Sequence, residues 1–167
     1  MKYAGQAQRF GDDINTDYII AAHRKMESLD LDVLARYTFE DIDPGFVTRV
    51  RPGDIAVAGR NFGCGSSRET AVHVLKRCGI SAVVAQSFAR IFFRNAINNG
   101  LPLVECDTSA VAGGDWVELD LDAGLVRLAP GAPVQSVPPL PSVMQAVLEE
   151  GGLVPYLRKH GDLVIPS

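Results

Sequence analysis

The sequence predicts an α/β fold in which parallel strand-helix-strand units are joined to an added antiparallel hairpin. Two continuous apolar runs, at residues 54–59 and 81–85, are separated by a segment with helical spacing at residues 70–78. Strand, helix and strand in this order form a right-handed parallel crossover. After residue 113 two short segments alternate apolar and polar residues, as antiparallel strands do. With 167 residues, the chain is expected to form a single domain over residues 1–167.

The composition is that of a globular protein and indicates neither a nucleic-acid nor a membrane partner. Hydrophobic residues make up 47% and charged residues 22% of the chain, and the net charge is -4. No cluster of lysines and arginines forms a basic stripe, and no apolar run has the length of a membrane span. The first residues lack the apolar core of a signal peptide. We therefore expect a cytoplasmic protein that contacts no nucleic acid and no membrane.

The three cysteines, Cys64, Cys78 and Cys106, are too far apart in the sequence to form a usual metal knuckle. An odd number of cysteines in a cytosolic chain favours reduced thiols over disulfides. Cys78 and Cys106 are expected in or near the core, whereas Cys64 lies in a glycine-rich turn. Because the sequence contains no other convincing set of ligands, we expect that this chain by itself binds no metal and no cofactor.

The first part of the chain shows weak patterns. Weak alternation predicts an edge strand at residues 3–10, and an acidic, turn-rich segment follows at residues 11–17. This segment lacks the glycine and the distal glutamate of a calcium-binding loop. Residues 23–26 have no clear period and are expected to form a loop, whereas the spacing at residues 29–37 predicts a short amphipathic helix.

The later elements are bounded by clear start and stop signals. The helix at residues 70–78 ends at Gly79, and a second helix runs from a serine cap at Ser87 to Gly100. Helical spacing within this second helix predicts a core position for Phe88, Ile91, Phe92 and Ile97. The remaining elements are a strand at 101–104, hairpin strands at 115–121 and 124–128, a proline-rich connector at 129–141, and helices at 142–149 and 153–160.

The glycine-rich turn at residues 61–69 contains the residues best suited to bind a ligand. Its glycines can take positive φ or let the backbone approach a ligand closely. Ser66 or Ser67 can cap the following helix, whose free N–H groups and partial positive charge favour an anion. Arg68 adds a guanidinium that can bind a carboxylate at two points.

An ordinary structural explanation fits the same residues. Ser66 and Glu69 have the spacing of a capping box, which needs no ligand. The turn is neither a Walker phosphate loop nor a Gly-x-Gly-x-x-Gly loop, so its pattern indicates no nucleotide. The residues alone therefore leave two interpretations open, an anion site for an unidentified ligand and a helix cap.

Residues 63–69, together with residues 87–91 and Arg94-Asn95, resemble the small subunit of the isopropylmalate dehydratase group. That subunit corresponds to the swivelling C-terminal domain of aconitase. The Asp-rich segment at residues 12–17 is similar to the opening segment of the same family. The resemblance implies a swivelling β/β/α domain of the aconitase C-terminal type.

The resemblance also implies roles for particular residues of this chain. In the family the first serine of the pair is the catalytic base, and this serine corresponds to Ser66. Ser67 and Arg68 would bind the substrate carboxylate, and Asp17 would belong to the catalytic network. Arg24, in a segment similar to an Asn-Arg-Lys segment of aconitase, becomes a further candidate for substrate binding.

The implied activity is that of a hydro-lyase that removes and re-adds water on a hydroxy acid. The first choice is 3-isopropylmalate dehydratase of leucine biosynthesis, and the alternatives are homoaconitase, an aconitase-like enzyme and 2,3-dimethylmalate dehydratase. The sequence departs from the family in the segment around Arg24 and at Thr70, where a histidine is common. Both departures bear on the substrate more than on the reaction.

Hydroxide is a poor leaving group, and a Lewis-acid metal is the usual aid to its departure. The resemblance implies that this metal is a [4Fe-4S] cluster on a large partner subunit, whose own cysteines ligate the cluster. We therefore expect a heterodimer or heterotetramer that is active only when assembled. A stand-alone anion-binding or regulatory module is the alternative from another class.

Overall fold

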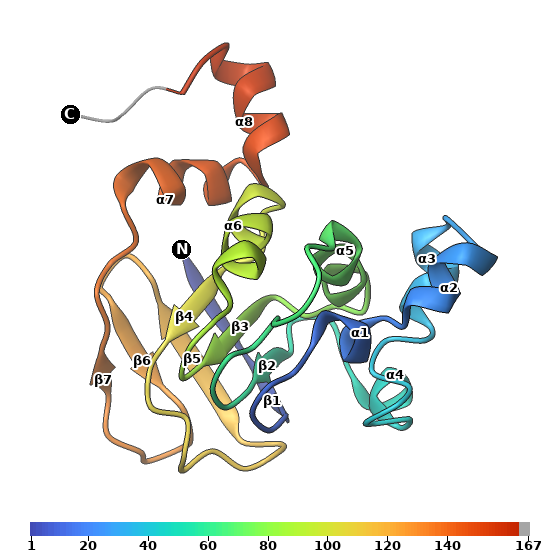
Figure 1. Ribbon diagram of the computed structural model, residues 1–167. Coiled ribbons are helices and arrows are strands. Elements are labelled where there is room, and N and C mark those ends of the chain that lie inside the picture. Colours follow the sequence, from blue (N-terminus) through green and yellow to red (C-terminus); the bar gives the residue numbers. More distant parts are fainter. Residues whose placement is uncertain (164–167) are drawn as a thin grey trace.

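The computed structural model describes residues 1–163 and centres on a seven-stranded sheet with the strand order β4-β3-β2-β1-β5-β6-β7 (Figure 1). The strands are β1 (Lys2–Arg9), β2 (Ile55–Val57), β3 (Ala82–Ala85), β4 (Leu103–Glu105), β5 (Trp116–Asp120), β6 (Leu125–Arg127) and β7 (Gln135–Ser136). The helices are α1 (Thr16–Ile19), α2 (Ala22–Glu27), α3 (Leu31–Ala35), α4 (Phe46–Arg49), α5 (Glu69–Arg77), α6 (Arg90–Asn98), α7 (Ser142–Glu149) and α8 (Leu153–His160). No helix within these residues is long and apolar enough to cross a membrane.

Strand β1 joins two halves of the sheet that differ in strand direction. Its residues Ala7–Arg9 pair in parallel with β2, and the parallel strands β3 and β4 follow. Its residues Lys2–Gln6 pair antiparallel with β5, and β5 pairs with β6 to form the hairpin. The predicted α/β fold, with parallel strand-helix-strand units and an added antiparallel hairpin, is therefore confirmed.

The predicted edge position of residues 3–10 is wrong, because β1 lies inside the sheet with a partner strand on each side. The alternation along β1 is weak because its two ends have different surroundings. Ala7 and Gln8 are both buried near β2, whereas Lys2 and Ala4 are exposed near β5. The position of a strand within a sheet depends on partner strands that are distant in the sequence. The local pattern of apolar and polar residues does not show which strands these are.

Two apolar cores cover opposite faces of the parallel half of the sheet. Along β2, Ala56 packs into the core that contains residues of α5 and α6, whereas Ile55 and Val57 pack into the core that contains residues of β5 and β6. Every residue of β2 and β3 is buried, which explains why both strands are continuous apolar runs. A third, smaller cluster joins α6 to α7 and α8, which lie beyond the end of the sheet in Figure 1.

Some local predictions differ from the structure. Residues 23–26 belong to helix α2 and not to a loop; α2 buries none of its residues, so it has no apolar period to detect. Ile91 is 51% exposed, although helical spacing predicted a core position. Helix α6 begins after Ala89 and not at a serine cap, because the Ser87 hydroxyl accepts a hydrogen bond from the Asn61 N–H at 2.8 Å.

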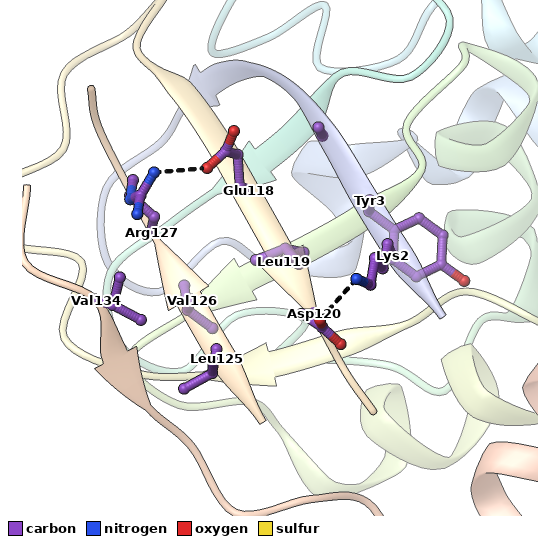
Figure 2. A pocket seen from close by; sticks show the side chains of 10 residues that line it. Lys2, Tyr3, Glu118, Leu119, Asp120, Leu125, Val126, Arg127 and Val134 are labelled. Atoms are coloured by element: carbon purple, nitrogen blue, oxygen red, sulfur yellow. Dashed lines mark hydrogen bonds and ion pairs between the residues drawn. The ribbon is translucent and has the colours of Figure 1, made fainter. Parts of the chain in front are cut away.

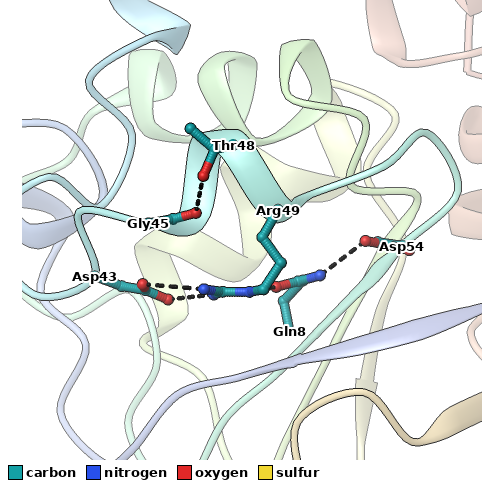
Figure 3. Close-up of polar contacts among 6 residues, drawn as sticks. All are labelled: Gln8, Asp43, Gly45, Thr48, Arg49 and Asp54. Atoms are coloured by element: carbon teal, nitrogen blue, oxygen red, sulfur yellow. Dashed lines mark hydrogen bonds and ion pairs between the residues drawn. The ribbon is translucent and has the colours of Figure 1, made fainter.

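A buried polar network anchors helix α4 to the sheet (Figure 3). Gln8 of β1 and Asp54, just before β2, are each only 4% exposed. The Gln8 side-chain amide donates to Asp54 Oδ2 at 2.8 Å, and its Oε1 accepts from Arg49 Nε at 2.9 Å. Arg49 also forms an ion pair with Asp43. The amide of Gln8 therefore links the start of β2 to α4, and its buried polar atoms are satisfied.

We predict that Gln8→Met destabilises the protein by about 1–3 kcal/mol, because the change keeps the side-chain volume but removes a buried hydrogen bond from Asp54 and another from Arg49. Urea unfolding followed by circular dichroism measures the change. Gln6→Met is the matched control, since Gln6 lies on the same strand but is exposed. The control should change stability by about 0.5 kcal/mol or less, and equal losses in the two variants would show that the network contributes nothing.

Candidate active site

The loops that follow β1 and β2 run alongside each other, although they are far apart in the sequence. Parallel pairing of β1 with β2 brings the carboxyl ends of both strands to one edge of the sheet, where ligand sites of α/β folds lie. The Gly63 N–H donates to the Ile14 carbonyl at 2.7 Å, and the Thr16 N–H donates to the Cys64 carbonyl at 2.8 Å. The acidic segment and the glycine-rich turn therefore form one structural unit.

The glycines of the turn are required both by backbone conformation and by close packing. Gly63 has a φ of +79° and Gly65 a φ of +93°, values that favour glycine. A Cβ atom on Gly63 would lie 2.1 Å from Phe92 Cγ, and one on Gly65 would lie 2.6 Å from Asn15 Oδ1. The expected positive φ is confirmed, and the space that the glycines leave is filled by side chains of this chain.

Ser66 and Ser67 precede helix α5 without capping it. The residue before the helix is Arg68, whose backbone is extended with a φ of −132°, and no side chain in the described part of the chain caps the helix. The capping-box interpretation of Ser66 and Glu69 is therefore wrong. Both serines are exposed, and they lie next to the uncapped N–H groups at the start of α5.

Arg68 and Asp17 form an ion pair that links the glycine-rich turn to helix α1. Asp17 lies in the first turn of α1, and its Oδ1 contacts Arg68 Nη1. The Arg68 side chain is 19% exposed and the Asp17 side chain 50% exposed. Apart from this ion pair, Nη1 has no hydrogen-bond partner within residues 1–163. Arg68 has five N–H donors, so the guanidinium can donate to a further carboxylate besides Asp17.

Thr16 and Asn95, to which sequence reasoning assigned no role, contact the serine pair. Thr16, at the start of α1, donates its hydroxyl to the Ser66 carbonyl at 3.0 Å. Asn95 of α6 donates its side-chain amide to Ser67 Oγ at 3.4 Å. Both residues lie in segments that resemble the isopropylmalate dehydratase small subunit, and this resemblance was the one sequence signal that could have pointed to them. Their contacts depend on how α1 and α6 pack against the turn, and no local pattern contains that information.

Arg24 is the predicted site residue that the structure does not connect to the turn. Its Nε and Nη2 donate to the two carboxylate oxygens of Glu40, each at 2.8 Å, and its Nη1 donates to Glu27 at 2.9 Å. Its guanidinium lies 3.8 Å from the centre of the Tyr37 ring. The hydrogen bonds with Glu40 raise the pKa of Arg24 and lower the pKa of Glu40. Among the described residues, these partners occupy each nitrogen of the guanidinium.

The cysteines of this chain do not fit an iron-sulfur cluster, whose ligands must be thiolates held close together. Burial, and to a smaller extent the charge of Asp13, raises the pKa of Cys64. Burial also raises the pKa of Cys78, and it raises that of Cys106 to about 11. Within residues 1–163, no group of three or more His, Cys, Asp and Glu side chains is placed to hold a metal ion.

A cavity of about 390 Å³ on the antiparallel half of the sheet contains none of the predicted site residues (Figure 2). The side chains that line it come mainly from β1, β5 and β6. Its charged residues form the cross-strand ion pairs Lys2 with Asp120 and Arg127 with Glu118, each at 3.2 Å. Because these charges neutralise each other, no unpaired cation among the lining residues is left to bind a carboxylate. The glycine-rich turn remains the candidate site.

Comparison with known proteins identifies the family. Residues 20–108 match the family model of the aconitase C-terminal domain, and the chain belongs to this family. It is 51% identical over 166 residues to the 3-isopropylmalate dehydratase small subunit 2 of Archaeoglobus fulgidus, which covers 99% of this chain and 100% of the relative. The 3-isopropylmalate dehydratase small subunit of Caldicellulosiruptor bescii is 46% identical over 160 residues, or 95% of this chain and 96% of the relative.

A solved structure supports the same assignment. The crystal structure of 3-isopropylmalate dehydratase from Methanocaldococcus jannaschii matches this chain with a TM-score of 0.90 and 43% sequence identity, and the match covers 96% of each chain. The resemblance to the small-subunit group, and the aconitase C-terminal fold that it implied, are therefore confirmed.

We predict that Gly63→Ala destabilises the protein by about 2–5 kcal/mol, because it adds the strain of positive φ to a collision with Phe92. Gly114→Ala is the control, since Gly114 has a φ of +87° but nothing within 4 Å of an added Cβ. The control should cost only the backbone strain, about 1–2 kcal/mol. Urea unfolding of both variants measures the difference, and a cost for Gly63→Ala no larger than the control would contradict the role of packing.

The pair formed by Arg24 and Glu40 should make stability depend on pH. The folded-state pKa of Glu40 lies below its ordinary value of 4.5, so the stabilisation should be complete above pH 4.5 and should disappear as the pH falls through the lowered pKa. Unfolding midpoints of wild type and Glu40→Gln, measured across this range, should converge at low pH. Glu27→Gln should have a smaller effect at neutral pH, because Glu27 is 54% exposed and makes a single contact with Arg24. A difference between wild type and Glu40→Gln that stays constant with pH would contradict the linkage.

Proposed function

We propose that this chain is the small subunit of a 3-isopropylmalate dehydratase, which isomerises 2-isopropylmalate to 3-isopropylmalate by dehydration and rehydration in leucine biosynthesis. The observation that carries the proposal is the exposed group of Ser66, Ser67 and Asp17 around Arg68, in a chain 51% identical over 99% of its length to a subunit of that name. A single domain over residues 1–167 and a cytoplasmic location belong to the same proposal.

Arg68 and the start of α5 supply the positive charge that this reaction needs. Removing a proton next to a carboxylate builds negative charge on that carboxylate, so donors that bind more strongly as the charge develops lower the barrier. The Arg68 guanidinium can bind both carboxylate oxygens. The uncapped N–H groups of α5, a helix of nine residues, add partial positive charge at the same place. Ser67 is proposed to donate its hydroxyl to the same carboxylate.

Ser66 is proposed as the base that removes the proton. A serine hydroxyl is a weak base unless its alkoxide is stabilised, and the positive field of Arg68 and the start of α5 favours the alkoxide. Ser66 is exposed, so a substrate can reach its hydroxyl. Asp17 is proposed to orient Arg68 through their ion pair until the substrate carboxylate binds the guanidinium.

The exposure of the site supports an enzyme that is assembled from two kinds of subunit. Ser66, Ser67 and Asp17 are open to solvent, whereas a reaction through developing charge benefits from the exclusion of bulk water. We propose that a large subunit covers this face, in a heterodimer or heterotetramer, and carries the [4Fe-4S] cluster. Within residues 1–163 the cysteines of this chain form no group of metal ligands that could hold that cluster.

The contacts of Arg24 support a substrate without a further carboxylate. A free guanidinium beside the site would suit a tricarboxylate, as in homoaconitase or an aconitase-like enzyme, because a buried cation needs a partner. The donors of Arg24 are instead occupied by Glu27 and Glu40. Isopropylmalate is therefore the first choice, and 2,3-dimethylmalate is the remaining dicarboxylate alternative. Arg24 can contact a substrate, as the resemblance implies, only where one of its acidic partners is displaced.

Ser66→Ala should lower the turnover of the enzyme reconstituted with its large subunit by about 10²–10⁴-fold, the contribution of a positioned general base. Turnover is measured with isopropylmalate, homoaconitate and dimethylmalate, and assembly is checked by co-purification, which the substitution should not change. Ser136→Ala, on the exposed part of β7, is the control and should keep full turnover.

The two possible failures of this experiment have different meanings. Full turnover in Ser66→Ala would remove Ser66 as the base but would leave the dehydratase assignment in place. A wild-type complex that assembles but turns over none of the acids would overturn the proposed function itself.

A further inference from the structure

We propose that Thr16 is a positioning residue for the Ser66-Ser67 pair, an inference that rests on the proposed function. Thr16 opens helix α1 and is only 2% exposed. Its hydroxyl donates to the Ser66 carbonyl at 3.0 Å, and its backbone N–H donates to the Cys64 carbonyl at 2.8 Å. One buried residue therefore holds the turn on both sides of Gly65.

The helix to which Thr16 belongs does not need this hydroxyl. Asn15 already caps α1 by accepting from the Asp17 N–H at 2.8 Å, and the Thr16 carbonyl accepts from the Ile20 N–H at 3.0 Å. Threonine hydroxyls commonly bond to the backbone of their own segment, whereas this one reaches a carbonyl 50 positions away. The contact therefore holds the glycine-rich turn and is not needed to form helix α1.

The contact sets the direction of the peptide group that joins Ser66 to Ser67. In a trans peptide the carbonyl and the N–H point in opposite directions, and the described chain has no cis peptide bond. Because the Ser66 carbonyl points to the buried Thr16, the Ser67 N–H points away from Thr16. Within residues 1–163 no acceptor binds this N–H, and Ser67 is exposed. Thr16 thus directs a fixed donor toward the open site.

Because other residues also contact the turn, the Thr16 hydroxyl is expected to set the orientation of the Ser66-Ser67 peptide group and not the position of the turn as a whole. On one side the turn packs against Asn15, whose Oδ1 would lie 2.6 Å from a Cβ on Gly65, and on the other side Asn95 of α6 contacts Ser67 Oγ. Loss of the Thr16 hydroxyl would therefore leave the turn in place and release the peptide group. Because the donors of Ser67 bind the substrate carboxylate more strongly as its negative charge develops, a misdirected serine pair should impair the proton transfer more than the binding of the substrate.

The test compares Thr16→Val, which keeps the shape of the side chain, with Thr16→Ser, which keeps the hydroxyl. In the complete complex, Thr16→Val should lower kcat by about 10–100-fold, with KM changed by about twofold or less. Thr16→Ser should restore kcat to within about threefold of wild type. Thr108→Val is the matched control, because Thr108 is fully buried and donates its hydroxyl to the Ala58 carbonyl at 2.6 Å. The control should lower stability and leave kcat unchanged.

A measurement on the isolated chain does not depend on activity. The carbonyl-carbon NMR signal of Ser66 should shift in Thr16→Val and stay near its wild-type position in Thr16→Ser. If the wild-type complex has no hydro-lyase activity, the proposed function fails, and this signal still decides whether Thr16 holds the peptide group. If Thr16→Val does not fold, Thr16→Ala is measured with the same expectation. An unchanged signal, an unchanged kcat, or a loss of kcat that Thr16→Ser does not restore overturns the inference.

Discussion

The parallel pairing of β1 with β2 is the constraint on which the candidate site depends. The register sets Arg9 opposite Val57, so both strands end together and the loops that leave them start side by side. Hydrogen bonds from Gly63 to Ile14 and from Thr16 to Cys64 then join the loops. A slip of one residue in the register would reverse the faces of β1 and separate these partners. The geometry of the serine pair is therefore a property of the sheet as much as of the turn.

The parts of the fold that could be predicted from the sequence are those with a local cause. Strands β2 and β3 are continuous apolar runs because both of their faces are buried, and Gly79 and Gly100 follow helices with φ of +101° and +71°. The inner position of β1 depends on the partner β2, which follows only after the α1–α4 segment. Helices α1 and α4 have four residues each, which is too few to show a period.

The candidate site could be predicted in part for the same reason. The turn contains Ser66 and Arg68 in adjacent sequence, so an anion site could be inferred, but the choice between a cap and a site required the backbone at Arg68. The acid that pairs with Arg68 lies in helix α1, and the resemblance pointed to it as a member of the catalytic network and not as the partner of Arg68. The partners of Arg24 could not be predicted from the sequence either, because Glu40 lies 16 positions further along the chain. A positive side chain in a sequence does not reveal which carboxylate already neutralises it.

The ion pair of Asp17 with Arg68 has a consequence for the chain before assembly. Because Asp17 is attached to the same polypeptide, it competes for the guanidinium at an effective concentration of about millimolar or higher. A small anion that binds Arg68 Nη1 must therefore compete with Asp17. An acid that makes further contacts besides the one with Arg68 competes with Asp17 better than a small free anion does.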